Sequence, residues 1–199
     1  MASESLSLYE SDAIQKGYRL IAGVDEAGRG PLAGPVVASA VVFSSPPKNL
    51  VLKDSKALTP GKRESLLLAI NREALTIGVG IVWPSLVDEI NIHHASLLAM
   101  ERAVNALNPV PHLLLIDGLF TIRSTIKQTP IVKGDTLSIS IAAASIVAKT
   151  TRDHIMYAYN KVYPEYRFAR NKGYGTKDHR TALRRLGRSP IHRASFRSI

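Results

Sequence analysis

Apolar residues along the chain follow two patterns, short continuous runs and longer segments in which apolar positions recur at helical spacing. The short runs are rich in branched residues, and they predict five strands, over residues 20–24, 36–43, 74–83, 112–116 and 129–132. The longer segments predict helices over residues 60–72, 85–107, 139–159 and 176–186. Residues 1–18 are polar and only weakly periodic, so we expect a short helix or partial disorder there.

Individual residues mark where several of these elements begin, break and end. Thr59 and Pro60 suit the N-cap and the first position of the first long helix. The second long helix is expected to break near Asn91, and the last helix, which is basic, to end at Gly187 as its C-cap. The small residues 142–145 predict that another element packs closely against the longest helix.

The order of these elements predicts the fold class. Strands that alternate with helices after an initial hairpin are typical of an α/β domain, here a central mixed sheet flanked by helices. We expect residues 1–18 to form an N-terminal extension and residues 19–160 the main domain. Residues 161–199 are expected to form a C-terminal basic helical region, an appendage that belongs to the same domain unit. No internal repeat and no long linker divides the chain.

Composition narrows the class of protein. The absence of cysteine excludes disulfides, thiolate metal sites and cysteine nucleophiles, and it fits a reducing cytosol. No run of 18 apolar residues and no basic-then-apolar leader occurs, so we expect a cytoplasmic protein without a membrane segment.

Charge is concentrated at one end of the chain. The net charge is +10, and residues 167–199 hold ten Lys and Arg against one acid, Asp178. A concentrated basic surface is typical of proteins that bind polyanions, and we favour nucleic acid over the alternative of a merely solvated basic tail.

Four carboxylates lie at the ends of predicted elements. Asp25 and Glu26 end the first strand, Asp117 ends the fourth, and Asp135 follows the fifth at the entrance to a helix. Ligand sites in open α/β sheets form at strand ends, and hard cations take oxygen ligands. Taken singly, Asp117 also suits an ordinary turn and Asp135 a helix N-terminus, but the joint occurrence of the four predicts a metal site.

The segment that follows the first strand adds candidate phosphate ligands. Gly28 and Gly30 let the backbone approach a ligand closely, and Arg29 presents planar donors suited to phosphate. Side chains of successive strand residues point to opposite faces, so we expect the strand to bend at Glu26 to bring both acids to one site. A glycine-rich turn with a solvated acid pair is the alternative for this stretch alone.

Several motifs together resemble the ribonuclease HII family over about residues 18–196. The most specific is Val24-Asp25-Glu26-Ala27-Gly28-Arg29-Gly30-Pro31-Leu32-Ala33-Gly34-Pro35. The others occur in the order found in the family: Asp54-Ser55-Lys56, Ile116-Asp117-Gly118, Lys133-Gly134-Asp135, residues 142–149, Arg152-Asp153 and Lys172-Gly173-Tyr174-Gly175-Thr176. The N-terminal extension is too short for the extra domain of ribonuclease HIII.

The resemblance implies a role for each matching position. Asp25, Glu26, Asp117 and Asp135 match the metal-binding catalytic acids. Gly28, Arg29 and Gly30 match the segment that senses the ribonucleotide and its junction with DNA. Tyr174 matches the tyrosine that packs on the sugar of the following deoxynucleotide. We also assign Ser55, Lys56 and Lys172 to substrate binding; a solvated loop lysine is the alternative for Lys56, and a core residue is the alternative for Tyr174.

The resemblance also implies an activity. It implies an RNase H-like fold and an endonuclease that hydrolyses RNA in RNA–DNA hybrids. The implied substrates include single ribonucleotides embedded in duplex DNA. The implied cleavage is on the 5′ side of the ribonucleotide and leaves a 3′-hydroxyl. Mn²⁺ or Mg²⁺, as one or two ions, is the implied cofactor, and we expect a monomer.

Two other functions compete with this hypothesis. Another RNase H-like nuclease, such as a junction resolvase, would account for the acids but not for Gly28-Arg29-Gly30. A non-catalytic basic RNA-binding protein would account for the charge but not for four acids at strand ends. Two further residues are expected to have structural roles: Asp153 is expected to pair with Arg152 on a helix face, and Trp83 is expected to lie in the core.

Overall fold

The computed structural model describes residues 8–45, 47, 50, 52 and 58–196. Its centre is a five-stranded mixed sheet with the strand order β3-β2-β1-β4-β5. The strands are β1 (Ile21–Ala27), β2 (Val36–Phe43), β3 (Ala74–Val82), β4 (Leu113–Asp117) and β5 (Lys127–Ile131). β1 pairs antiparallel with β2 and parallel with β4, while β3 and β5 form the two edges. The α/β mixed sheet expected from the sequence is confirmed.

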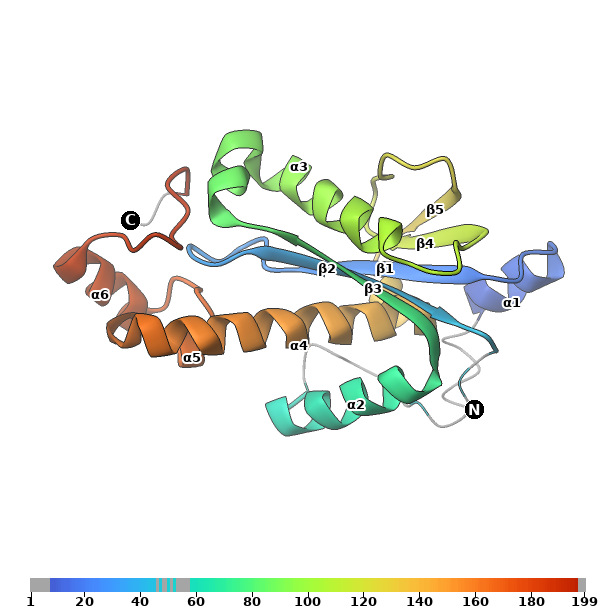
Figure 1. The fold of residues 1–199 in the computed structure, drawn as a ribbon, viewed down its shortest axis with the longest axis horizontal. Helices are drawn as coiled ribbons and strands as arrows, with labels where there is room; N and C mark the ends of the chain where they lie inside the picture. The colour runs from blue at the N-terminus through green and yellow to red at the C-terminus, as the bar shows by residue number, and fades with distance from the viewer. Residues whose placement is uncertain (1–7, 46, 48–49, 51, 53–57, 197–199) are drawn as a thin grey trace.

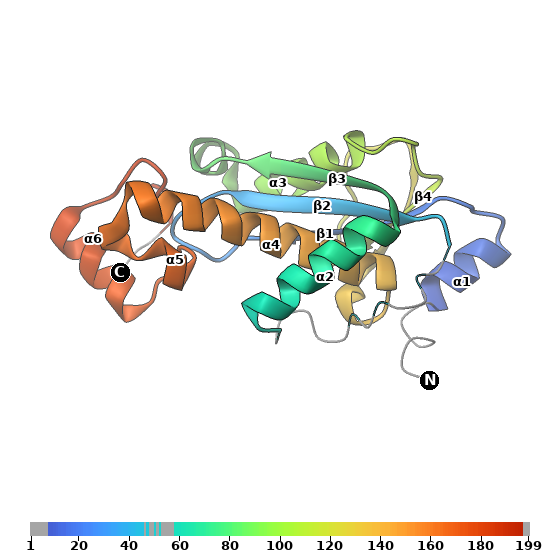
Figure 2. The same cartoon turned by 60° about the horizontal axis from the view of Figure 1, so that its bottom comes forward.

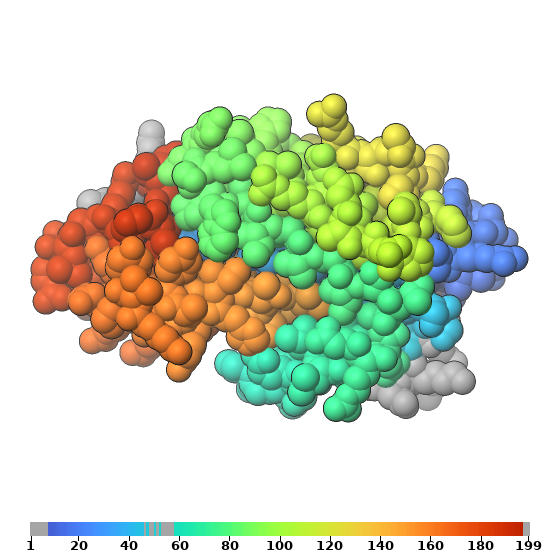
Figure 3. Space-filling model, in the orientation of Figure 1, coloured from blue at the N-terminus to red at the C-terminus, as the bar shows by residue number. Residues whose placement is uncertain are grey.

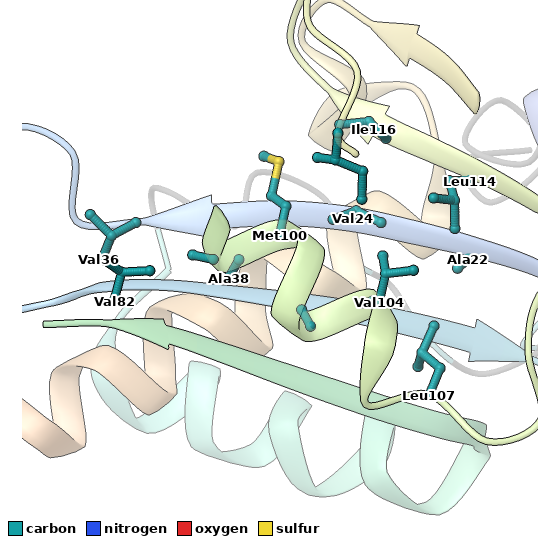
Figure 4. Packing of buried hydrophobic residues seen from close by; sticks show 14 of the residues in the cluster. Ala22, Val24, Val36, Ala38, Val82, Met100, Val104, Leu107, Leu114 and Ile116 are labelled. Carbon is teal, nitrogen blue, oxygen red and sulfur yellow. The ribbon is translucent and has the colours of Figure 1, made fainter. Parts of the chain in front are cut away.

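Helices cover both faces of the sheet, which explains why β1, β2 and β4 are nearly continuous apolar runs. In Figures 1 and 2, α3 (Pro84–Asn105) lies over one face, and α4 (Ile139–Val162) and α2 (Pro60–Glu73) lie over the other. Figure 4 shows Met100 and Val104 of α3, and Leu107 just after it, packed over side chains of β1, β2 and β4. Burial of this apolar surface is the main force that holds the layers together.

The contact between the sheet and α4 is unusually close. A Cβ atom at Gly23 of β1 would lie 2.0 Å from the backbone carbon of Ser140, so only glycine fits there. Ser39 of β2 donates its hydroxyl to the carbonyl oxygen of Ala144 at 2.8 Å. The close packing predicted for residues 142–145 is confirmed, because small side chains let the helix backbone reach the strands.

The C-terminal elements gather at one end of the molecule, as Figures 1 and 3 show. They are η3 (Pro164–Tyr166), α5 (Phe168–Asn171) and α6 (Lys177–Leu186). A small core joins them to the rest of the chain through Met156 of α4 and Ala33, which follows β1. The domain division at residue 160 stays a prediction.

Most element boundaries lie within three residues of those predicted. The break near Asn91 is confirmed, since this residue has φ 64° inside α3, and Gly187 is the C-cap of α6. α1 (Leu8–Gln15) forms a short helix in the N-terminal segment, and η2 (Gly134–Thr136) precedes α4. Trp83 was wrongly expected in the core and is 44% exposed. None of the helices in the described residues is both long and apolar enough to span a membrane.

Candidate active site

The candidate site lies where β4 stops and β1 continues. The parallel pairing of β1 with β4 runs only from Ile21 to Val24, so Asp25 and Glu26 lie beyond its last paired residue. Asp117 is the last residue of β4 and lies beside them. These three acids line one cavity of about 430 Å³, whose other lining residues are Ala27, Gly28, Arg29, Gly30, Ser145, Lys149 and Tyr174.

Asp25 and Glu26 reach the cavity from opposite faces of a regular strand. The pairing of β1 with β2 continues without a break through Ala27, so the bend expected at Glu26 is wrong. Asp25 accepts a hydrogen bond from Ser145 of α4, while Glu26 also lines a second hollow against α3. Both acids meet one cavity because β4 has ended, and no strand separates the two faces at that point.

The three acids repel one another electrostatically and are partly shielded from water. Burial raises the pKa of Asp25 well above its usual value, and the charges of Glu26 and Asp117 raise it further. Hydrogen bonds from Ser145 and from the Glu26 N–H, at 2.7 Å, oppose this rise. Burial also raises the pKa of Glu26, against the opposing effect of Arg29, whose Nη1 lies 3.3 Å from Oε1. Such a cluster favours binding of a proton or a cation.

Asp135 is the fourth predicted acid, and it does not line the cavity. It lies buried in η2, next to Gly134, whose N–H donates to Asp117 Oδ1 at 2.7 Å. The structure therefore brings three of the four acids together and ties the segment that carries the fourth to Asp117. In the part of the chain that the structure describes, no three acidic, imidazole or thiol side chains are arranged to hold a metal ion.

Two buried arginines hold the loop that follows β1. Arg193 donates to the carbonyl oxygens of Gly28 at 2.5 Å, Arg29 at 2.9 Å and Gly34 at 3.0 Å. Arg152 donates in the same way to Ala33, Pro35 and Lys172, at 3.0–3.1 Å. Burial lowers the pKa of Arg152 to about 10 and that of Arg193 to about 9. Each guanidinium replaces lost water with carbonyl oxygens, which offsets the cost of burying its charge.

Gly28 depends directly on this arrangement. Its φ is +99°, and a Cβ atom there would lie 2.2 Å from Nε of Arg152. Sequence reasoning missed both arginines, since it paired Arg152 with Asp153 and left Arg193 in the basic tail. Asp153 in fact pairs with Arg63 and Lys149, at 3.3 Å and 2.5 Å.

Tyr174 reaches the cavity from the C-terminal region. It is 46% exposed, which argues against the core alternative. Its carbonyl oxygen lies 2.9 Å from Nδ1 of His179, whose Nε2 lies 3.0 Å from Nε2 of His192. Burial lowers the pKa of both histidines, to about 4 for His192. The neutral pair thus links the backbone at Tyr174 to the segment around Ser189, which donates its N–H to His192 Nδ1.

The remaining predicted ligands have mixed outcomes. Arg29, Gly28 and Gly30 line the cavity, but Lys172 does not, because its ammonium donates to the carbonyl of Ala169 at 2.5 Å. Ser55 and Lys56 lie outside the described residues. The cavity also includes Ser145 and Lys149, which sequence reasoning had not assigned to the site. Their one signal was their place in the motif of residues 142–149.

Comparison with known proteins identifies the family. The sequence profile of the family "Ribonuclease HII" matches residues 22–199. Ribonuclease HII of Clostridioides difficile strain 630 is 53% identical over 193 residues, which are 97% of this chain and 76% of the relative. The crystal structure of ribonuclease H2 from Pyrococcus horikoshii OT3 has a TM-score of 0.76 at 27% identity, covering 90% of this chain and 94% of that one. Bst-RNase HIII in complex with Mn²⁺ is alike in fold, with a TM-score of 0.72 at 19% identity, covering 100% of this chain and 70% of that one.

The chain therefore belongs to the ribonuclease HII family. It is a metal-dependent hydrolytic endoribonuclease of the ribonuclease H type. This membership excludes the two competing functions, a junction resolvase and a non-catalytic RNA-binding protein.

Proposed function

We propose that this member of the family cleaves the phosphodiester on the 5′ side of a ribonucleotide, in RNA–DNA hybrids and at single ribonucleotides embedded in duplex DNA. One observation carries the proposal. Asp25, Glu26 and Asp117 share a single cavity with the Gly28–Gly30 loop and Tyr174. The cavity therefore places acids suited to metal-assisted hydrolysis next to groups suited to binding a sugar and its phosphate.

We assign the divalent cation, Mn²⁺ or Mg²⁺, to the four acids. No three acids in the described part of the chain are arranged around an ion, but the chemistry of the donors fits, because Asp25, Glu26 and Asp117 offer carboxylate oxygens, which such hard cations take. Asp135 is the fourth candidate ligand, on the segment that Gly134 ties to Asp117. When bound, the ion lowers the pKa of the attacking water and offsets charge on the leaving oxygen. Mn²⁺ in Bst-RNase HIII, a protein of the same fold, supports this assignment.

The chain's own residues bind and orient the scissile phosphate. The water oxygen bonds to phosphorus, the bond to the 3′-oxygen breaks, and the products end in a 3′-hydroxyl and a 5′-phosphate. Lys149 lines the cavity, is held by Asp153 and supplies positive charge for the phosphate. Burial lowers the pKa of Lys149, although the partner Asp153 favours its charged form.

Recognition of the ribonucleotide falls to two loops. The 2′-hydroxyl both donates and accepts hydrogen bonds, and backbone groups of Gly28, Arg29 and Gly30 line the cavity where it would lie. The ring of Tyr174 packs on the sugar of the following deoxynucleotide, which lacks that hydroxyl. Arg152 and Arg193 fix the backbone of both loops and act as positioning residues.

The rest of the duplex lies on the basic C-terminal region. Residues 167–199 carry most of the excess positive charge, which attracts the phosphate backbone. Ser55, Lys56 and Lys172 remain assigned to substrate binding. We further propose that the enzyme acts as a monomer in the cytoplasm.

Tyr174 variants test the assignment of the site. With Mn²⁺ and a duplex that contains one ribonucleotide, we expect 5′ cleavage by the wild-type protein. Tyr174→Phe should keep nearly full activity, and Tyr174→Ala should lose at least about tenfold, in line with the contribution of an aromatic contact to a nucleotide. The loss should be larger on the single ribonucleotide than on a continuous hybrid. Equal losses on both substrates, or a fall in melting temperature that accounts for them, would remove Tyr174 from recognition.

A further inference from the structure

A second hollow adjoins the active-site cavity on the side of α3. Its volume is about 260 Å³, and it shares Glu26, Arg29 and Asp117 with the main cavity. Its other end is largely apolar, lined by His93, Ser96, Leu97, Met100, Gly118, Leu119, Phe120 and Val132. The hollow is therefore charged where it meets the catalytic acids and apolar where it leads away from them.

The floor of the hollow is one face of the second segment of α3. His93, Ser96, Leu97 and Met100 follow the spacing of a single helical face. The kink at Asn91 sets the start of this segment, because Asn91 Oδ1 accepts from the backbone N–H of His93 at 2.9 Å. Phe120 packs edge-on against His93, with ring centroids 4.6 Å apart. The hollow thus combines one face of α3 with loop residues that follow β4 and β5.

The rim exposes apolar side chains that nothing in the described chain covers. Leu119 is 71% exposed, Phe120 53% and Val132 55%. Leu119 and Phe120 follow Asp117 in sequence, so this surface begins within two residues of a catalytic acid. Neighbouring exposed apolar residues that line a groove indicate a binding surface.

The position of the hollow relative to Tyr174 indicates which part of the substrate would lie in the hollow. Tyr174 lines the main cavity but not the hollow, whereas the acids Glu26 and Asp117 line both. A strand that places the nucleotide 3′ of the ribonucleotide on Tyr174 and the scissile phosphate at the acids must continue in the 5′ direction. The hollow adjoins the acids and is not lined by Tyr174, so it can receive that continuation.

We propose that the hollow holds the deoxyribose of the nucleotide immediately 5′ of the scissile phosphate, with its sugar against Leu119 and Phe120. This inference rests on the proposed function of the main cavity. The charged end of the hollow faces the phosphate, and the apolar end faces the sugar carbons. Leu119 and Phe120 offer no hydrogen-bonding group, so a 2′-hydroxyl placed against them loses water without gaining a partner. The surface therefore selects deoxyribose on the 5′ side, as Tyr174 does on the 3′ side.

The test uses the full chain with Mn²⁺ and two duplexes. Both have a ribonucleotide on the 3′ side of the scissile phosphate, and they differ only in whether the nucleotide on its 5′ side is a deoxynucleotide or a second ribonucleotide. Cleavage at that one bond is scored on sequencing gels. For the wild-type protein we expect kcat/KM to be about tenfold higher with deoxyribose, the discrimination expected for one unpartnered hydroxyl. The double variant L119A/F120A should raise KM on the deoxyribose duplex about tenfold and bring the preference close to one.

Controls separate this contact from folding and from chemistry. Leu68→Ala removes an exposed leucine of α2 outside both cavities, and its KM and sugar preference should match the wild type. Leu119 and Phe120 are exposed, so L119A/F120A should melt within about 2 °C of the wild type, as surface substitutions usually do. An unchanged KM and sugar preference in the double variant would overturn the proposal and indicate a protein partner for this surface. Absence of cleavage by the wild-type protein would instead contradict the proposed function.

Discussion

The molecule buries two groups of like charges at adjoining positions and treats them in opposite ways. Asp25, Glu26 and Asp117 are close enough that the charges of Glu26 and Asp117 raise the pKa of Asp25, and Arg29 opposes the rise in the pKa of Glu26. Arg152 and Arg193 are more deeply buried, but their guanidinium groups donate to backbone carbonyl oxygens.

The difference indicates that the two arginines stabilise the fold, whereas the acids are suited to binding a ligand. The arginines are satisfied within the chain, so they stabilise the loop that they hold. The acids are buried close to one another, and burial and mutual repulsion disfavour their charged forms. Functional sites commonly retain such unfavourable electrostatics, because the ligand provides the compensation.

The largest effect should come from the acids. Asp25→Asn keeps the shape of the side chain and its ability to accept hydrogen bonds, but it removes one charge from the cation site. We expect kcat to fall by at least about a thousandfold, comparable to the loss of a key electrostatic group in other active sites. Duplex binding should survive, as judged by fluorescence anisotropy with Mg²⁺. Asp12→Asn in α1, an exposed acid that pairs with Lys16, is the matched control. Near-normal turnover in Asp25→Asn would contradict the catalytic role.

The next effect concerns stability and comes from the arginines. Arg193→Met should destabilise the fold by at least about 3 kcal/mol, because it leaves several buried carbonyl oxygens without donors. Urea denaturation followed by circular dichroism measures the change. Arg185→Met, on the exposed side of α6, should change stability by less than about 0.5 kcal/mol. Equal effects of the two substitutions would show that the buried arginine is not structurally special.

The smallest effect is the pH dependence of stability, which should distinguish the buried acids from the buried arginines. Because folding raises the pKa of Asp25 and Glu26, the native state holds their protons more tightly than the unfolded state does. Their contribution to stability is therefore full below the unfolded pKa values and is lost as pH rises through the folded values. Asp25→Asn should melt a few degrees above the wild type at pH 8 and the gap should close toward pH 4, at about 2–4 °C per kcal/mol. Scanning calorimetry without divalent ions would show this, and a gap that widens in acid would reverse the sign of the argument.

The acids that line the cavity and the elements of the fold were largely predictable from local sequence. The apolar runs of β1, β2 and β4 and the kink at Asn91 are local signals, and the structure confirms them. Asp25, Glu26 and Asp117 were recognisable because each follows such a run. Asp135 was predicted together with them, but it does not line the cavity. Its position depends on how η2 packs, which is not a local signal in the sequence.

Sequence by itself determined the family, the order of the elements and the identity of the acids, since these follow from periodicity and motifs along the chain. The tertiary structure alone decided how the acids meet. A regular strand sends Asp25 and Glu26 to opposite faces, and they share one cavity only because β4 ends beside them. It also decided that Arg193, 165 positions from Gly28, holds the loop that follows β1. Every residue carries the same backbone carbonyl group, so the sequence does not show which distant side chain donates a hydrogen bond to it. Only the folded chain shows which arginine is the donor.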